Sequence, residues 1–170
     1  YGIKYLIEAY ENLYTKYQGL YKGKKLRLLI GGSGQEEAAL KEQVAGLESR
    51  ESIRFLGRVQ PDVIVATYNS CDICVFPSLR EGFGVSAIES QACQVPVIIT
   101  RVGGHPESVE EGQTGLIVES KSAETLLAAM DKLMTDDNMR LAMGKKARDF
   151  VVSTYRFEDN FEDISKLYDM

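Results

Sequence analysis

Residues 77–98 read PSLREGFGVSAIESQACQVPVI, and they hold most of the functional information in the chain. An apolar run ends at Phe76, a glycine turn occupies positions 82–84, and a helix-like segment begins at Val85. A strand, a glycine turn and a helix N-terminus together form an anion site, because backbone N–H groups there point outward and the helix dipole favours negative charge. Two carboxylates, Glu81 and Glu89, bracket the turn. Since the two oxygens of a carboxylate can accept from neighbouring hydroxyl groups, the stretch predicts a ligand that joins a phosphate to a sugar.

The size and composition of the chain are typical of one globular domain. Its 170 residues are enough for a single core, and its 44% hydrophobic and 26% charged residues exclude a disordered chain. The net charge of −5 argues against a nucleic-acid surface, which is normally basic. No apolar run is long enough to span a membrane. Three cysteines form no disulfide framework, so we expect a reducing compartment, the cytoplasm.

Strand-like and helix-like segments alternate along the chain. The expected strands are 26–30, 52–56, 73–76, 97–100 and 115–118, and the expected helices are 1–17, 36–47, 61–69, 85–93, 123–134, 138–152 and 157–170. Such alternation predicts an α/β fold with a doubly wound parallel sheet, whose ligands bind at the carboxyl ends of the strands. No repeat or linker divides residues 1–170, so we expect a single domain with a helical C-terminal segment.

The ordered residues from 75 to 98 resemble a family signature. Val75-Phe76, Pro77-Ser78 and Glu81-Gly82-Phe83-Gly84 precede Glu89, and Pro96-Val97-Ile98 follows it. This order is similar to the Glu-x7-Glu signature of the retaining GT-B glycosyltransferases of family 4, the group 1 glycosyltransferases. The resemblance implies the Rossmann-like half of a GT-B fold. It also implies transfer of a sugar from a nucleoside-diphosphate sugar to an acceptor hydroxyl, with retention of the anomeric configuration.

The same resemblance assigns roles around the glycine turn. Glu81 would hydrogen-bond hydroxyls of the transferred sugar and serve catalysis, while Glu89 would bind the ribose 2′- and 3′-hydroxyls. Backbone N–H groups on the turn and the first helical residues would hold the donor phosphates, because N–H groups there have no intrahelical partner. These are the N–H groups of Phe83, Gly84, Val85 and Ser86.

Two earlier turns have ordinary explanations as well. The turn at 31–34 reads equally well as a plain strand-to-helix turn, and it is no dinucleotide fingerprint, because Glu37 stands where the third glycine belongs. By resemblance, Gly32 would face the donor and the backbone at Arg58 and Val59 would read the nucleobase. A solvated side chain is nevertheless the more common role for a single arginine.

Three other features need an explanation. His105 lies in a loop at 103–107 that resembles a family Gly-Gly-x-Pro-Glu motif, and its variable position favours an exposed loop residue over a catalytic one. Gln94 stands where the family usually has glycine at a helix end, so we expect strain there. Cys71 and Cys74 form a C-x-x-C without a second pair, which argues against a zinc or redox role.

The chain opens in a helix, whereas a doubly wound domain normally opens with a strand. Residues 1–9 resemble the segment that follows the first strand of the C-terminal, donor-binding domain. The resemblance implies a domain that lacks its first strand, the basic loop residues that grip the diphosphate, and the N-terminal acceptor domain; such a chain would be inactive alone. The alternatives are a non-catalytic nucleotide-sugar-binding module and another GT-B enzyme, such as a nucleotide-sugar epimerase.

No cofactor or metal is expected. The Asp-x-Asp arrangement that binds Mn²⁺ in other glycosyltransferases is absent, and the one Asp pair, Asp136-Asp137, falls between two expected helices. The expected partners are a nucleotide sugar and an acceptor glycan or lipid held by the absent N-terminal domain, with no nucleic acid. The full-length enzyme could also associate peripherally with a membrane. Capsule, lipopolysaccharide, glycolipid and storage-glucan synthesis all remain open as pathways.

Overall fold

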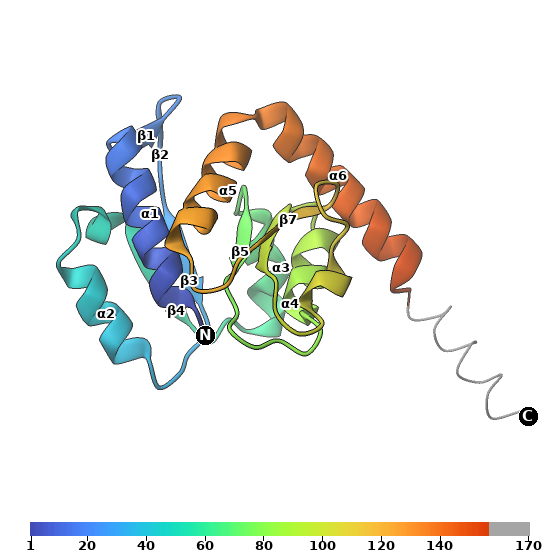
Figure 1. The fold of residues 1–170 in the computed structure, drawn as a ribbon, viewed down its shortest axis with the longest axis horizontal. Coiled ribbons are helices and arrows are strands. Elements are labelled where there is room, and N and C mark those ends of the chain that lie inside the picture. Colours follow the sequence, from blue (N-terminus) through green and yellow to red (C-terminus); the bar gives the residue numbers. More distant parts are fainter. Residues whose placement is uncertain (157–170) are drawn as a thin grey trace, which may run out of the picture.

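The computed structural model describes residues 1–156 (Figure 1). Its helices are α1 (Ile3–Tyr17), α2 (Glu37–Ala45), α3 (Pro61–Asn69), α4 (Val85–Ala92), α5 (Ala123–Thr135) and α6 (Asp137–Thr154), with short 3₁₀ helices at Glu48–Ser52 and His105–Ser108. Its strands are β1 (Leu20–Tyr21), β2 (Lys24–Lys25), β3 (Leu28–Gly31), β4 (Ile53–Gly57), β5 (Cys74–Phe76), β6 (Val97–Thr100) and β7 (Gly115–Val118). Each strand and helix expected up to residue 152 is confirmed; the expected helix at 157–170 lies outside the described residues.

The strands of the predicted sheet pair in parallel but form two ladders. β3 pairs with β4, and β5, β6 and β7 form a second ladder in that order. Within residues 1–156 no ladder of hydrogen bonds joins β3 to β5. The α/β class with parallel strands is therefore confirmed, while the single continuous sheet is replaced by two parallel pieces.

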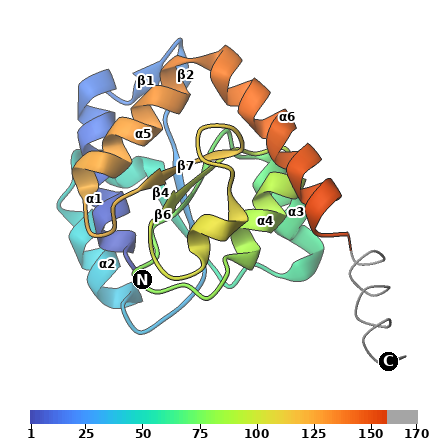
Figure 2. The same cartoon turned by 45° about the vertical axis from the view of Figure 1, so that its right-hand side comes forward.

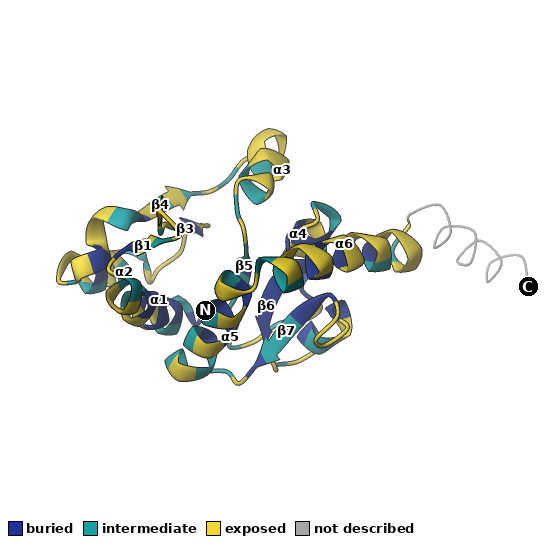
Figure 3. Cartoon of the chain, turned by 90° about the horizontal axis from the view of Figure 1, so that it is seen from above, coloured by how far each residue is buried: buried dark blue, intermediate teal, exposed yellow. Residues whose placement is uncertain are grey.

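Helices cover both faces of the larger ladder, as a doubly wound fold requires. β6 is buried along its whole length, and its side chains alternate between two cores. Val97 and Ile99 pack with Ala87 of α4, whereas Ile98 packs with Leu126 of α5 on the opposite face. Figure 3 shows α1 and α5 together on one side of the strands and α4 with α6 on another.

Helix α1 joins the two ladders. Its residues Leu6 and Leu13 pack into the core under β6 and α5, while Ile7 and Tyr10 pack against Ile30 of β3. Leu6 and Leu13 lie seven residues apart on one stripe of the helix, and Ile7 and Tyr10 lie three apart on the adjoining stripe, so a single helix can fill two cores. The confirmed amphipathic pattern of residues 1–17 therefore holds together parts of the fold that share no strand ladder.

A polar contact fixes α1 to α5. Lys16 Nζ lies 2.9 Å from Asp131 Oδ1, and the Tyr17 hydroxyl donates to the same oxygen at 2.7 Å. Burial alone would raise the pKa of Asp131, but the hydrogen bonds from Tyr17 and Lys16 outweigh it and lower that pKa. The carboxylate therefore stays charged where it joins the two helices.

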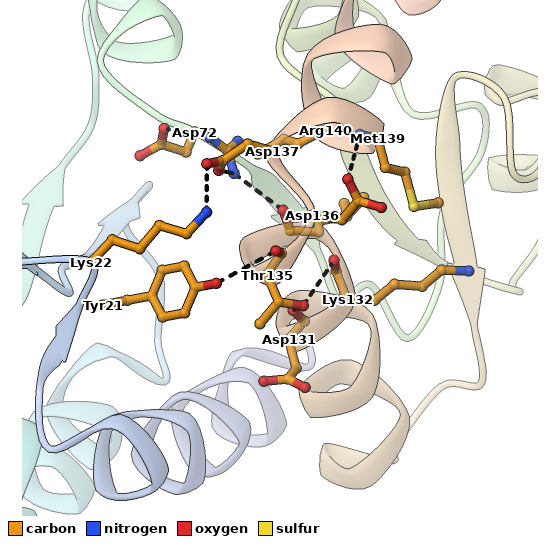
Figure 4. Close-up of polar contacts among 11 residues, drawn as sticks. Tyr21, Lys22, Asp72, Asp131, Lys132, Thr135, Asp136, Asp137, Met139 and Arg140 are labelled. Atoms are coloured by element: carbon orange, nitrogen blue, oxygen red, sulfur yellow. Dashed lines mark hydrogen bonds and ion pairs between the residues drawn. The ribbon is translucent and has the colours of Figure 1, made fainter.

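The hairpin β1–β2 was not predicted, and it contacts the junction of α5 and α6 (Figure 4). Lys22 Nζ lies 2.7 Å from Asp137 Oδ2, and Arg140 Nη1 lies 2.7 Å from the other oxygen. Asp136 caps α6 by accepting a 2.8 Å hydrogen bond from the Met139 N–H. Only Asp136 thus lies between the two helices, as expected for both members of the pair, whereas Asp137 is the first residue of α6; both have structural partners.

Helix α6 lies beside α4 in two views (Figures 1 and 2). A Cβ on Gly144 of α6 would overlap the carbonyl oxygen of Gln94, so only glycine permits this approach. Gln94 itself has a φ of 62°, in the left-handed region that favours glycine. The strain expected at this position is therefore present in the backbone.

Within residues 1–156, no helix has the length and apolarity needed to cross a membrane.

Candidate functional site

The site is built from loops at the carboxyl ends of the parallel strands. After β3 and β4, the Gly32 N–H donates to Gly57 O at 2.7 Å, which holds the two loops together. Both glycines have positive φ, 106° and 65°, so the turn geometry requires them. Arg58 is exposed, and Val59 Cγ2 lies 3.4 Å from where a Cβ on Gly31 would be. The structure thus brings the predicted residues at 32, 58 and 59 to one edge.

The start of α1 lies against the end of β5. A Cβ on Gly2 would overlap the carbonyl oxygen of Pro77, so the two backbones are in direct contact. An open hollow of about 410 Å³, lined by Tyr1, Leu79 and Arg80, lies at the same place. Within the described residues, no hydrogen bond or ion pair joins the loops after β3 and β4 to the glycine turn after β5.

The glycine turn ends in the predicted anion site. Gly84 precedes α4 with φ 91° and ψ 46°, and its carbonyl accepts from the N–H groups of Ala87 and Ile88. The N–H groups of Val85 and Ser86 find no acceptor within residues 1–156, and both residues are exposed. Two free donors at the positive end of a helix are the arrangement that binds phosphate.

Glycines also fit the loop at 103–105 tightly against this turn. A Cβ on Gly103 would overlap the Glu81 carbonyl oxygen, and one on Gly104 would overlap the Gly82 carbonyl oxygen. Each contact brings one backbone against another with no side chain between them. The two loops therefore form one close-packed unit, which explains why the second Gly-Gly pair accompanies the first turn in the sequence.

Glu81 is partly exposed and is oriented by short-range contacts. Its Oε2 accepts from Ser78 Oγ at 3.3 Å, and its Oε1 accepts from the Gly82 N–H at 3.1 Å. Ser78 is buried, and its carbonyl accepts a 2.6 Å hydrogen bond from Thr100 Oγ1 of β6. The carboxylate is thus anchored to the end of the larger ladder while its other lone pairs remain available to a ligand.

Glu89 has a hydrogen-bond partner that was not predicted from the sequence. The hydroxyl of Tyr68, at the end of α3, donates to Glu89 Oε2 at 3.0 Å. Burial, followed by the negative charge of Glu89, raises the pKa of Tyr68, so the phenol stays a proton donor. Since the two residues are 21 positions apart on different helices, no local pattern indicates the pair.

His105 is not the exposed loop residue that we expected. Only 1% of its surface is exposed, and its ring lies edge-on to Phe76 with centroids 6.5 Å apart. Burial lowers the pKa of His105, and the charge of Glu81 offsets this only in part. The expectation was wrong because the flanking glycines allow the loop to turn the ring inward, an effect of packing that single-residue statistics miss.

The end of α6 covers the turn. Tyr155 packs edge-on to Phe83 at a centroid distance of 5.6 Å, and its hydroxyl donates to Glu107 O at 3.2 Å. Phe83, whose backbone was expected to hold phosphate, therefore uses its side chain to bind the end of the helix. This contact was also missed, because 72 residues separate the two rings.

The cysteines give no sign of a metal site. Cys74 lies in β5, as expected, and hydrogen bonding from its thiol lowers the pKa of Cys71 to about 7. All three cysteines of the chain are free. Within residues 1–156 no group of three or more metal-ligating side chains comes together.

The fold is that of the C-terminal domain of GT-B glycosyltransferases. Sucrose-phosphate synthase from Thermosynechococcus elongatus superposes with a TM-score of 0.86 and 27% identity, over 98% of this chain and 41% of that one. The C-terminal domain of a glycosyl transferase group 1 family protein, LpcC, from Francisella tularensis superposes with a TM-score of 0.80 and 26% identity. That match covers 92% of this chain and 80% of the other.

Sequence comparison gives the family itself. The family described as "Glycosyl transferases group 1" matches residues 1–150, and the chain belongs to it. The chain is also 32% identical, over 172 aligned residues, to the D-inositol 3-phosphate glycosyltransferase of Corynebacterium urealyticum. This alignment includes 98% of the present chain and 39% of the relative, so the chain spans about two fifths of that protein's length.

Proposed function

We propose that the chain is the donor-binding domain of a retaining glycosyltransferase that moves a sugar from a nucleoside diphosphate to an acceptor hydroxyl. One observation carries the proposal: two free N–H groups, of Val85 and Ser86, lie at the start of α4 between the carboxylates Glu81 and Glu89. The N–H groups and the helix dipole suit a diphosphate. Glu89 then binds the ribose, and Glu81 binds the transferred sugar.

Catalysis in this proposal is mainly electrostatic. The N-terminus of α4 stabilises the departing diphosphate, since fixed dipoles there need no reorganisation as charge develops. His105, whose pKa is lowered by burial, does not reach solvent and offers no general base. We propose that the reaction needs no metal, because the N–H groups and the dipole at the start of α4 supply the positive potential that the departing diphosphate requires.

The nucleobase belongs in this proposal at the loops after β3 and β4. The hydrogen bond between Gly32 and Gly57 presents their backbone at the same edge as the exposed Arg58. Backbone groups there can pair with the edge of a base, as the family resemblance implies for Gly32, Arg58 and Val59. The acceptor is assigned to a separate N-terminal domain, in keeping with the two fifths of its relative that the chain spans.

We also propose that a strand preceding Tyr1 in the whole protein lies between β3 and β5. Each of these strands uses one edge for its own parallel ladder, and no ladder joins them within residues 1–156. A parallel strand there would end at the carboxyl edge, where Gly2 already contacts Pro77. Hydrogen exchange tests the idea: adding the natural upstream residues should protect the amides of both strands, and unchanged exchange would refute it.

The phosphate site can be tested by placing a negative charge at the start of α4. A thermal-shift panel of UDP, GDP and ADP, with the corresponding nucleotide sugars, first identifies the tightest diphosphate. Val85 is 62% exposed, so Val85→Asp and Val85→Asn both leave the core intact. The aspartate suits a helix N-terminus but repels the diphosphate. We expect at least tenfold weaker diphosphate binding for the aspartate than for the asparagine, with nucleoside binding equal in both; equal diphosphate binding would refute the site.

The alternative of a non-catalytic binding module is decided on the intact protein. A transferase releases the nucleoside diphosphate only in the presence of acceptor and yields a glycosylated product of retained configuration. A binding module holds the nucleotide sugar without turnover, and an epimerase changes the sugar without an acceptor. Residues 1–170 alone should bind weakly and transfer nothing, because the acceptor domain is absent from them; sugar transfer by this chain would contradict the assignment.

A further inference from the structure

His105 lies directly beneath the turn that starts α4. A Cβ built on Gly84 would come within 2.5 Å of His105 Cδ2 and 3.0 Å of Nε2. The edge of the imidazole therefore contacts the backbone at the residue that precedes the two free N–H groups. Only glycine fits above the ring, and the φ of 91° at Gly84 favours glycine for a second reason.

Contacts fix both the ring and the backbone of His105. Gly104 packs against the Gly82 carbonyl just before it, Phe76 lies edge-on to the ring, and Ser108 Oγ donates to the His105 carbonyl at 2.7 Å. His105 opens the 3₁₀ helix His105–Ser108, so its backbone is fixed by hydrogen bonds as well. Because His105 is fixed in this way, its ring can hold the backbone of Gly84 in place.

Packing alone does not explain a histidine at this position. Its Nδ1 is buried and has no hydrogen-bond partner among the described residues. An unpaired polar atom in the interior costs free energy that an apolar side chain would avoid. Two properties distinguish the imidazole from leucine or phenylalanine. One is hydrogen bonding with the backbone of Thr100, which acts to raise the pKa of the ring against the effect of burial. The other is its shape, a flat five-membered ring whose narrow edge fits under a backbone turn.

We propose that His105 is a positioning residue, which supports Gly84 and thereby aims the N–H groups of Val85 and Ser86 at the donor diphosphate. The inference rests on the proposed function and adds to it the support beneath the phosphate turn. His105 does not touch the donor, since only 1% of it is exposed, and it acts through the glycine backbone. A smaller side chain lets the turn sink, and a larger ring pushes it outward.

The test compares a nucleoside diphosphate with its own nucleoside. Isothermal titration uses whichever of UDP, GDP and ADP stabilises the wild-type chain most, and then the matching nucleoside. For His105→Ala and His105→Phe we expect about tenfold weaker diphosphate binding with less than twofold change for the nucleoside. Met143→Ala is the control for lost stability, because Met143 lies in the core between α1 and α5 and not in the core that contains Ala87 of α4. This variant should leave the ratio of the two affinities unchanged.

A second measurement needs no variant. His105 is the only histidine of the chain, so its ring resonances can be assigned without ambiguity in a protein freed of any histidine tag. We expect the diphosphate to shift these resonances and the nucleoside to leave them in place. Unshifted resonances, or variants that keep the wild-type ratio of affinities, would overturn the role of His105 but leave the proposed function intact. A wild-type chain that binds no diphosphate would overturn the proposed function, and this inference with it.

Discussion

The phenol of Tyr68 donates a 3.0 Å hydrogen bond to Glu89 Oε2 and so ties the end of α3 to the helix that carries the candidate anion site. We predict that Tyr68→Phe weakens nucleotide binding about fivefold, because one hydrogen bond to an exposed carboxylate is worth about 1 kcal/mol. Isothermal titration measures the loss. The double variant with Glu89→Gln should bind no more weakly than Glu89→Gln alone, and additive losses would show that the two residues act independently.

Substitution of the two glutamates should affect different steps, nucleotide binding for Glu89 and turnover for Glu81. Glu89→Gln in the intact enzyme should weaken binding of the free nucleoside diphosphate by roughly ten- to a hundredfold, since losing a charged acceptor costs about 1.5–3 kcal/mol. Glu81→Gln should leave that affinity nearly unchanged and lower turnover, because its proposed partner is the sugar near the reacting bond. Titration beside steady-state kinetics separates the two, and equal losses of nucleotide affinity would show a wrong assignment.

Turnover by the intact enzyme should survive chelation. The proposed leaving-group stabilisation comes from the start of α4 and its N–H groups, and both members of the Asp136-Asp137 pair have structural partners. Activity in EDTA should therefore match activity in added Mn²⁺ or Mg²⁺. If EDTA abolishes turnover and Mn²⁺ restores it, the helix-dipole account is wrong.

Replacing Gln94 by glycine should stabilise the fold by about 1 kcal/mol. Gln94 is exposed at φ 62°, where a side chain is strained and glycine is not. Urea unfolding measures the gain. The matched control is Gln60→Gly, because Gln60 is also exposed but has an ordinary φ of −78°, so this change should be slightly destabilising. A gain of equal size at both positions would contradict the explanation by strain.

The contacts of Asp131 predict that the free energy of unfolding depends on pH in the acid range. The pKa of Asp131 is lowered in the folded state by Tyr17 and Lys16, against the effect of burial. Its stabilisation is thus complete above the unfolded pKa, about 3.9, and is lost as pH falls through the lower folded pKa. Between pH 6 and pH 2, Asp131→Asn should lose less stability than the wild type in urea unfolding. Parallel curves would show that this carboxylate does not contribute.

Much of the fold follows from the sequence because its signals are local. The glycine turn at 82–84, the alternation of apolar runs and the helical period of residues 1–17 each fall within one short window, and each predicted its element. The β1–β2 hairpin was missed, although Lys22 and Gly23 both take the positive φ that a two-residue hairpin turn needs. Lysine is a weak signal for such a turn.

In the candidate site, too, the local features were predicted from the sequence and the contacts between distant residues were not. Val85 and Ser86 follow from their place on the first turn of a helix, and the structure leaves their N–H groups free as that place predicts. The Tyr68 contact to Glu89 and the buried ring of His105 do not follow from any local pattern. They depend on which helices and loops meet in space, and pairs so far apart along the chain leave no periodic trace.

The position of α1 has a consequence for how the protein is made. Its partner Asp131 lies 115 residues further along the chain than Lys16. At roughly 5–20 residues per second, a ribosome takes about 6–23 s to synthesise that interval. Throughout this time the apolar face with Leu6 and Leu13 has emerged without the helix that will cover it. Within residues 1–156, α1 is therefore the helix whose apolar face waits longest for its partner during translation, and we expect this face to be a site where nascent chains engage a chaperone.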